Sequence, residues 1–244
     1  MVVRARKGQT SYGEVIGILM LDTYTPFIPG DVGNASTYSF PVRYETVKGL
    51  TVSRIFSKDR GALPAIREAG RKLVGQGVRA VTGDCGFMAI FQEDLAGELG
   101  VPVFLSSLLQ APFISRIIGR GKKVGIISAN SEALDDGTLL TAVGIDASIP
   151  VCIKGLQDRE HFHKAVIEEI GMLDPDEIER EVVNAAEELV QEDPDVGAIL
   201  LECSVLPPYG AAVQEAVGLP VFDYVTMIDY VYAAVVKERY VGIM

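Results

Sequence analysis

The sequence predicts an α/β fold made of two similar lobes, each a parallel sheet flanked by helices, with the lobes related by a pseudo-twofold axis. Short apolar, β-branched runs alternate along the chain with longer stretches of helical periodicity. These runs lack polar alternation, which is typical of parallel strands covered by helices on both faces. An internal repeat then indicates that the same strand–helix arrangement occurs twice.

Strands are expected where the apolar runs lie between turn-forming residues: 15–21, 50–56, 79–84, 101–104, 122–128, 148–154, 197–202 and 219–222. Helices are expected between them, at about 62–75, 88–99, 108–118, 131–142, 174–191, 208–217 and 225–238. The helix at 174–191 has the clearest start, because Asp174 can cap it, Pro175 suits its first position and Glu177 completes a capping box.

The repeat appears when the chain is shifted along itself so that Val78–Phe104 falls on Val196–Phe222 without a gap. Cys85 then coincides with Cys203, and the preceding acid, Asp84, coincides with Glu202. The period is too long for a solenoid and predicts two lobes instead. We expect a first lobe over 1–107, a second over 108–222, and a last segment, 223–244, that crosses back to the first.

Composition limits the classes of partner. The chain has 244 residues and a net charge of −11, which argues against nucleic acid or an anionic membrane surface as a partner. No apolar run reaches the length of a membrane span, and no signal peptide is recognised at the start. We therefore expect a cytoplasmic protein with reduced thiols that binds a small molecule, and a homodimer as the default assembly.

Cys85 and Cys203 each follow an apolar strand pattern and an acid. Ligands of parallel α/β sheets collect at the carboxyl ends of strands, and backbone N–H groups at a helix start favour a thiolate. Two thiols on opposite sides of one cleft could remove a proton from one face of a carbon and return it to the other. The alternative is that both are inert buried cysteines.

At these residues the chain resembles the cofactor-independent aspartate/glutamate/hydantoin racemases. The resemblance implies two similar lobes that each supply one cysteine of a proton-transfer pair, here Cys85 and Cys203. It also implies that the loop after the second lobe's first strand binds substrate carboxylate, which makes Asn130 and Ser131 candidates. The residues after the cysteines depart from the amino-acid racemases and look more like the hydantoin branch. Gly86, Phe87 and Ser204 are therefore candidate substrate contacts.

The long loop at 24–49 is a further candidate, because long loops in compact domains are often functional. Arg43 could clamp a carboxylate, and Asn34 or Thr37 could hydrogen-bond a substrate. The alternative is a solvated surface loop. Cys152, inside an apolar strand pattern, is expected to be a core thiol. His161 and His163 have no companions at metal-ligand spacing, so we expect no metal and no organic cofactor.

The sequence thus predicts a racemase or epimerase acting on a small, anionic, carboxylate-bearing or hydantoin-like molecule. Two alternatives remain open. One is a decarboxylase or cis–trans isomerase of the same superfamily that uses a single cysteine, and the other is a two-lobed protein that binds a small acid without turning it over. In each case the cleft should lie between the lobes, lined from 24–43, 84–87, 128–132 and 202–206.

Overall fold

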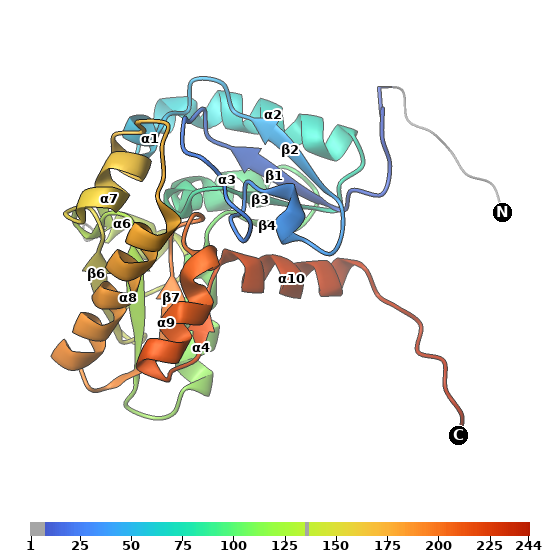
Figure 1. Ribbon diagram of the computed structural model, residues 1–244. Helices are drawn as coiled ribbons and strands as arrows, with labels where there is room; N and C mark the ends of the chain where they lie inside the picture. The colour runs from blue at the N-terminus through green and yellow to red at the C-terminus, as the bar shows by residue number, and fades with distance from the viewer. Residues whose placement is uncertain (1–7, 135–136) are drawn as a thin grey trace.

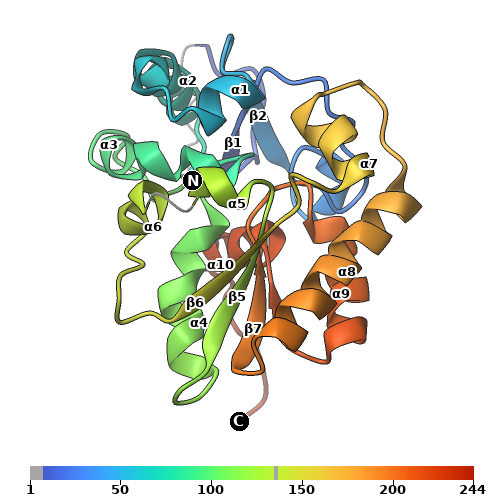
Figure 2. The same ribbon diagram turned by 90° about the vertical axis from the view of Figure 1, so that its left-hand side faces the viewer.

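The computed structural model describes residues 8–134 and 137–244 and contains two four-stranded parallel sheets (Figures 1 and 2). Their strand orders are β2-β1-β3-β4 and β6-β5-β7-β8, so the two sheets have the same topology. The strands are β1 Ile16–Met20, β2 Val42–Thr46, β3 Ala80–Gly83, β4 Val103–Phe104, β5 Lys123–Ser128, β6 Val151–Gly155, β7 Val196–Leu201 and β8 Val221–Phe222. The predicted α/β fold with two similar parallel sheets is confirmed.

Ten α-helices and several single turns connect the described strands. The α-helices are α1 Val52–Phe56, α2 Leu63–Gly75, α3 Gln92–Ala96, α4 Ala111–Ile117, α5 Ser131–Leu134, α6 Thr138–Ala142, α7 Glu160–Phe162, α8 Pro175–Glu192, α9 Gly210–Val217 and α10 Tyr224–Val235. The turns are the 3₁₀ segments η1 Ala35–Thr37, η2 Arg60–Ala62, η3 Gly86–Phe91, η4 Ser107–Gln110 and η6 Pro207–Tyr209, and the π-helical segment η5 His163–Ile167. Asp174 caps α8 as expected, since its carboxylate accepts the N–H groups of Asp176 and Glu177.

Several expected elements differ from the structure. The helix expected at 88–99 starts as the 3₁₀ segment η3, and only Gln92–Ala96 is α-helical. Residues 50–56 were expected to form a strand, but the chain forms α1 there, because the Thr51 hydroxyl caps its first turn by accepting the N–H of Arg54. The second strand of the first sheet is instead β2, inside the stretch that was expected to be loop. The helix expected at 131–142 is divided into α5 and α6, with 135–136 outside the described residues.

Glycines in the two central strands set how closely the helices pack. A Cβ at Gly17 in β1 would lie 3.0 Å from the side chain of Leu73 on α2, and one at Gly125 in β5 would lie 2.9 Å from Leu189 on α8. Each distance is shorter than ordinary van der Waals contact, so the absent side chain leaves room for the helix. The same device occurs at corresponding places in the two sheets.

The last helix, α10, packs against the first sheet although it follows the last strand of the second (Figure 1). Tyr224, Met227 and Ile228 are buried in one cluster with Ile16 and Ile18 of β1. The Tyr224 hydroxyl also donates to the carbonyl of Leu105, at 2.8 Å. Because α10 directly follows β8 of the second sheet, its packing against β1 connects the two sheets.

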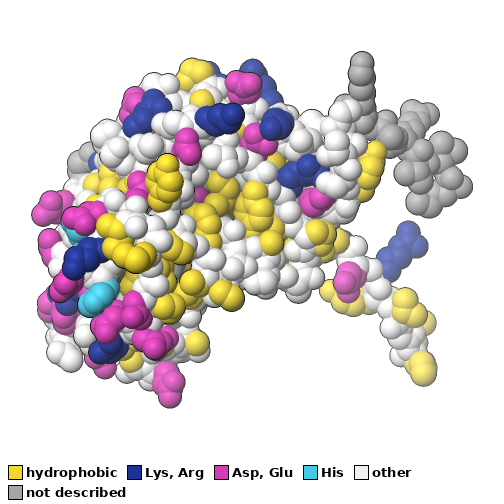
Figure 3. Space-filling model, turned by 45° about the horizontal axis from the view of Figure 1, so that its top comes forward, with side chains coloured by type: hydrophobic (Ala, Val, Ile, Leu, Met, Phe, Trp, Pro, Cys, Tyr) yellow, Lys and Arg dark blue, Asp and Glu magenta, His cyan; other side chains and the backbone are white. Residues whose placement is uncertain are grey.

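The surface is strongly acidic in one region. Acidic side chains gather at the lower left of the space-filling view, on the side where α7 and α8 lie (Figure 3). Lys154 and Arg159 both reach Glu188 on α8, at 3.0 and 2.6 Å, so part of this charge is paired. Among the described residues, no helix combines the length and apolar character that crossing a bilayer requires.

Candidate active site

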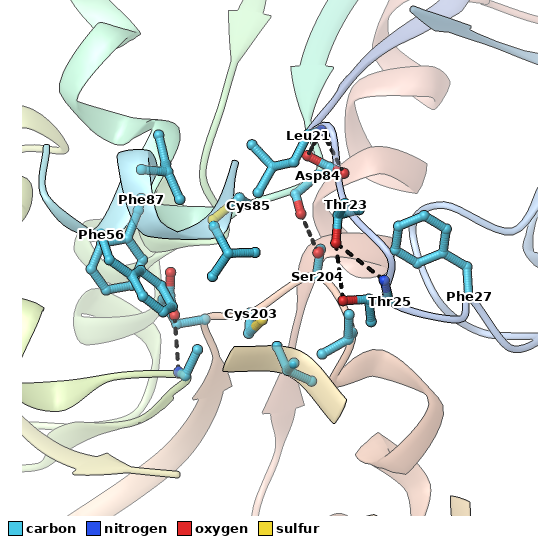
Figure 4. Close-up of a pocket in the computed structure, with 16 residues that line it drawn as sticks. Leu21, Thr23, Thr25, Phe27, Phe56, Asp84, Cys85, Phe87, Cys203 and Ser204 are labelled. Carbon is cyan, nitrogen blue, oxygen red and sulfur yellow. Dashed lines mark hydrogen bonds between the residues drawn. The ribbon is translucent and has the colours of Figure 1, made fainter. Parts of the chain in front are cut away.

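A partly open pocket lies where the carboxyl ends of the two sheets face each other (Figure 4). About 440 Å³ of space, part of it open to solvent, lies among its lining side chains. They are Leu21, Thr23, Thr25, Phe27, Val52, Ile55, Phe56, Asp84, Cys85, Phe87, Ala129, Val166, Glu202, Cys203, Ser204 and Val205. The pocket therefore draws on both lobes and contains both cysteines of the repeat.

The two thiols sit in matching backbone settings. Cys85 follows β3 and Asp84, and its sulfur accepts the N–H of Phe87. Cys203 follows β7 and Glu202, and its sulfur accepts the N–H of Val205. Each thiol is thus held by the N–H two residues further along the chain. Both side chains are 7% exposed and point into the pocket (Figure 4).

Burial dominates the acidity of both thiols. It raises the pKa of Cys85 and Cys203 well above the ordinary value, and the charge of Glu202 raises both further. The N–H groups of Phe87 and Val205 act in the opposite direction and do not outweigh it. The N–H groups of the turn after each strand therefore act as expected, but burial has the larger effect on the pKa of each thiol. A positive charge beside the thiols, or a neighbouring group that takes their proton, would favour the thiolate form.

The acids before the cysteines hold the ends of the neighbouring central strands. Both oxygens of Asp84 accept the N–H of Leu21, each at 3.0 Å, just after β1. In the second lobe Glu202 Oε2 accepts from the Ser128 hydroxyl at 3.1 Å and from the N–H of Ala129 at 3.4 Å, at the end of β5. Burial raises the pKa of each carboxyl to about 7. Both acids can therefore exchange protons near neutral pH.

Glu202 extends across to the first lobe. A Cβ at Gly86 would overlap Glu202 Oε1, and that oxygen is buried with no hydrogen-bond partner among the described residues. Gly86 is therefore a glycine because the carboxyl group of Glu202, and behind it the Glu202 backbone carbonyl at 2.8 Å, occupy its side-chain space. Ser204 makes the reverse crossing, since its hydroxyl donates to the backbone carbonyl of Asp84.

Aromatic and hydroxyl groups occupy opposite sides of the pocket (Figure 4). Phe56 and Phe87 meet edge to face, with ring centroids 4.8 Å apart and planes inclined by 62°. On the other side, the Thr23 hydroxyl lies 3.1 Å from that of Thr25, with Phe27 beyond them. The Thr23 hydroxyl also donates to Glu169 of the second lobe, which accepts the N–H of Tyr24 at 3.1 Å as well. The loop after β1 is thereby fastened across the cleft.

Three candidates from the long loop lie outside the residues that line this pocket. Asn34 caps η1 and donates to the carbonyl of Phe27 at 3.0 Å, while the Thr37 hydroxyl donates to the carbonyl of Asp31 at 2.7 Å. Arg43 lies on β2 and pairs with Glu14 at 3.2 Å. These polar groups build the loop and the sheet edge, so the structure does not present them to a ligand here.

The carboxylate-loop candidates are also directed elsewhere. Asn130 accepts the N–H of Ala133 at 2.9 Å, and the Ser131 hydroxyl lies 3.2 Å from the Gln157 amide nitrogen. Both stabilise the start of α5, and neither lines the pocket. Only the preceding residue, Ala129, does. Of the ten candidate residues from the sequence, the pocket brings together Cys85, Cys203, Phe87 and Ser204.

Several lining residues were not anticipated. Leu21 and Thr23 follow β1 directly, ahead of the stretch expected to form the cleft, and Val52, Ile55 and Phe56 belong to α1. The missed signal was Thr51, a helix-capping residue that would have turned residues 52–56 from a strand into a helix. Val166 comes from the π-helical turn η5, for which the sequence carries no comparable signal.

No group of three or more His, Cys, Asp or Glu side chains within 8–134 and 137–244 is arranged to hold a metal ion. The ring of His161 lies 3.0 Å from Glu181, and that of His163 lies 2.6 Å from the carbonyl of Gln157. Both histidines are thus engaged around α7 and away from the cysteines.

No protein-family model matches the chain. It is 34% identical over 224 residues to a dimethylsulfoniopropionate lyase of Durusdinium sp. clade D, which covers 88% of this chain and 73% of that protein. It is 30% identical to dimethylsulfoniopropionate lyase 7 of Emiliania huxleyi, over 93% of this chain and 69% of that one.

Solved structures extend the comparison at the level of fold. Unliganded arylmalonate decarboxylase superposes with a TM-score of 0.60 at 15% identity, over 93% of this chain and 94% of the other. The aspartate racemase of Picrophilus torridus does so with a TM-score of 0.56 at 16% identity, over 91% and 94%. These likenesses show a shared fold, whereas the lyases share sequence. The chain belongs to the dimethylsulfoniopropionate lyase family and has the fold of the Asp/Glu racemase superfamily.

Proposed function

We propose that the protein is a cofactor-independent carbon–sulfur lyase that acts on a β-sulfonio carboxylate such as dimethylsulfoniopropionate, with a cysteine as the base. The observation that carries the proposal is one pocket holding both Cys85 and Cys203, in a chain 34% identical to a named lyase for that compound. The neighbouring acids, Asp84 and Glu202, would exchange protons with the thiols.

The reaction is an elimination. A thiolate takes a proton from the carbon next to the carboxylate, and the C–H electron pair becomes the new carbon–carbon double bond. The bond between the β-carbon and sulfur breaks, and its electrons leave with sulfur, so the products are neutral dimethyl sulfide and acrylate. No redox partner is needed, and one base is sufficient, because no proton returns to the carbon.

The positive charge of the substrate would help one of the thiols to lose its proton. Burial raises the pKa of both thiols, and no Lys, Arg or His is among the lining residues of the pocket. A bound sulfonium brings a positive charge beside the thiols, and a nearby positive charge favours the thiolate. Proton release to Asp84 or Glu202, whose pKa values lie at about 7, is then matched to neutral pH.

A racemase or epimerase is the second candidate. It is favoured by the matching settings of the two sulfurs, each of which accepts the N–H two residues on. Two-base inversion needs thiols on both faces of one carbon, and such a pair would supply them. A decarboxylase of the single-cysteine kind would use the same pocket with a malonate-type substrate.

One experiment separates these functions. The purified protein is incubated in D₂O with dimethylsulfoniopropionate, with single enantiomers of amino acids and hydantoins, and with an arylmalonate. Released dimethyl sulfide is measured by gas chromatography, and NMR follows acrylate and deuterium at each stereocentre. We expect stoichiometric dimethyl sulfide and acrylate. Deuterium exchange with inversion, and no sulfide, would establish the racemase instead, and binding without any turnover would leave a small-acid binding protein.

A further inference from the structure

We infer that the pocket is polarised, with a subsite for an onium cation built by Phe56, Phe87 and Glu202, and a carboxylate subsite at Thr23 and Thr25 on the opposite side. This inference deepens the proposed function and rests on it for the identity of the substrate. It states which end of a β-onium carboxylate lies on which side of the pocket. It also names the residues that favour a cationic over a neutral ligand.

The aromatic pair is the first element of the cation subsite. The rings of Phe56 and Phe87 stand edge to face, 4.8 Å apart, so one ring can present its electron-rich face to a ligand while the other supports it. Aromatic faces attract methylated cations, and the attraction grows when the site excludes water. Phe87 is 1% exposed, and both rings lie on the same side of the pocket (Figure 4).

Glu202 is the second element. It is fully buried, lines the pocket, and keeps one oxygen, Oε1, without a hydrogen-bond partner among the described residues. That oxygen lies at the backbone of Gly86, next in the chain to Phe87. A buried carboxyl oxygen without a partner is costly, and a cation beside it would remove the cost. The lining residues offer no cation of their own, so the ligand is its natural source.

The opposite side suits a carboxylate. The Thr23 hydroxyl gives its one proton to Glu169, so at the 3.1 Å contact with Thr25 it can only accept. The Thr25 hydroxyl keeps its own proton, which can turn from Thr23 to a ligand carboxylate. The link between Thr23 and Glu169 holds both residues in place. The two cysteines lie between the aromatic and hydroxyl sides in Figure 4. A substrate that spans the pocket would thus present the carbon next to its carboxylate to the thiols.

A matched pair of ligands tests the charge selection without turnover. N,N-dimethyl-β-alanine carries a protonated tertiary ammonium, and 4-methylpentanoate has the same shape with a neutral carbon in its place. Isothermal titration calorimetry gives the affinity of each. We expect the wild type to favour the cation by about tenfold, the scale of a desolvated cation–π contact.

Three variants locate the subsite. Phe56→Leu should reduce the preference by about three- to tenfold and leave the affinity for 4-methylpentanoate nearly unchanged, because leucine keeps the apolar surface without the ring. Glu202→Gln should reduce it as well. Phe87→Leu should behave like Phe56→Leu, but it alters a fully buried residue, so Phe56 carries the test. Phe27→Leu is the matched control, since Phe27 lines the same pocket beyond the threonines and its loss should leave the preference intact.

The outcomes are distinct from those of the function assay. Equal affinities of the two ligands in the wild type would overturn the cation subsite, even in a protein that releases dimethyl sulfide. If Phe27→Leu loses the preference for the cationic ligand and Phe56→Leu keeps it, the cation binds on the threonine side, opposite to the proposed assignment. A retained preference without any lyase activity would uphold the subsite and overturn the proposed function.

Discussion

The two halves of the pocket have similar backbone arrangements around their cysteines and differ in the side chains beside them. In the first lobe the cysteine is followed by Gly86 and Phe87, and in the second by Ser204 and Val205. Each sulfur accepts the N–H of the second of these residues, and each preceding acid holds the end of the neighbouring central strand. The flanks, however, are aromatic beside one cysteine and aliphatic beside the other.

This difference indicates what kind of substrate the pocket suits. A racemase needs a base on each face of one carbon, which two matching thiols could provide. The proposed elimination needs one base and places for an onium end and a carboxylate end, which Phe56 with Phe87 and Thr23 with Thr25 would supply on the two sides of the pocket. The repeat supplies two thiols, and the unlike flanks would decide how each is used.

The largest expected difference between the two halves is in the activity of variants that lack one of the two cysteines. In an elimination only one thiol acts as the base, and loss of a general base typically lowers the rate by about 10²–10⁴-fold. We expect either Cys85→Ser or Cys203→Ser to lower kcat for dimethyl sulfide release by that factor, and the other to lower it by less than about tenfold. Gas chromatography of the released sulfide measures both.

Cys152→Ser serves as the control, because Cys152 lies on β6 and outside the pocket. Its activity should stay close to that of the wild type. Equal collapse in the Cys85 and Cys203 variants would support two-base chemistry instead, and full activity in both would remove the cysteines from the mechanism.

Making the first half resemble the second should destabilise the protein. In Gly86→Ser the new side chain would overlap Glu202 Oε1, and overpacking of this kind costs about 1–3 kcal/mol. Chemical denaturation measures the loss of unfolding free energy. The double variant with Glu202→Asp, whose shorter side chain withdraws the carboxyl group, should recover part of it. The reverse change, Ser204→Gly, should cost less, since it removes one hydroxyl hydrogen bond and adds no overlap.

A destabilisation of Gly86→Ser that Glu202→Asp leaves unchanged would mean that the backbone carbonyl of Glu202, 2.8 Å from the Cβ position, or the local backbone conformation requires glycine, and not the carboxyl group. Gly86 is not among the glycines with positive φ, so we expect the rescue.

The two acids should give the stability a pH dependence of the same sign in both halves. Burial raises the pKa of Asp84 and Glu202 to about 7, above their unfolded values. Each stabilising contribution is therefore complete below about pH 4 and is lost as pH rises to about 7, with a slope of at most about 1.4 kcal/mol per pH unit for each group. Asp84→Asn and Glu202→Gln should each flatten the fall in unfolding free energy over this range.

Asp146→Asn is the matched surface control. The Ser148 hydroxyl lowers the pKa of Asp146, so its contribution has the opposite sign and falls below this pH range. The slope between pH 4.5 and 7 should stay that of the wild type in this variant. An Asp84→Asn profile parallel to the wild type would mean that Asp84 is already ionised in the folded protein.

Sequence patterns are enough to predict the α/β class, the two similar halves and the position of both cysteines at strand ends. These features follow from local patterns: apolar runs of strand length, helical periodicity, the cap at Asp174, and a gap-free repeat around Cys85 and Cys203. The similarity to the lyases is also a property of the sequence, because it is spread over 88% of the chain. The motifs around the two cysteines, by contrast, indicate only the wider racemase superfamily.

Which side chains face the pocket depends on contacts between distant parts of the chain. Arg43, Asn34 and Asn130 had suitable chemistry, but their polar groups are used within their own lobes by hydrogen bonds and ion pairs that no local pattern predicts. Conversely, Gly86 is explained by a carboxyl group 116 positions along the chain, at Glu202. The raised pKa of each thiol likewise depends on how completely the closed lobes exclude water, because desolvation is a property of the packed whole.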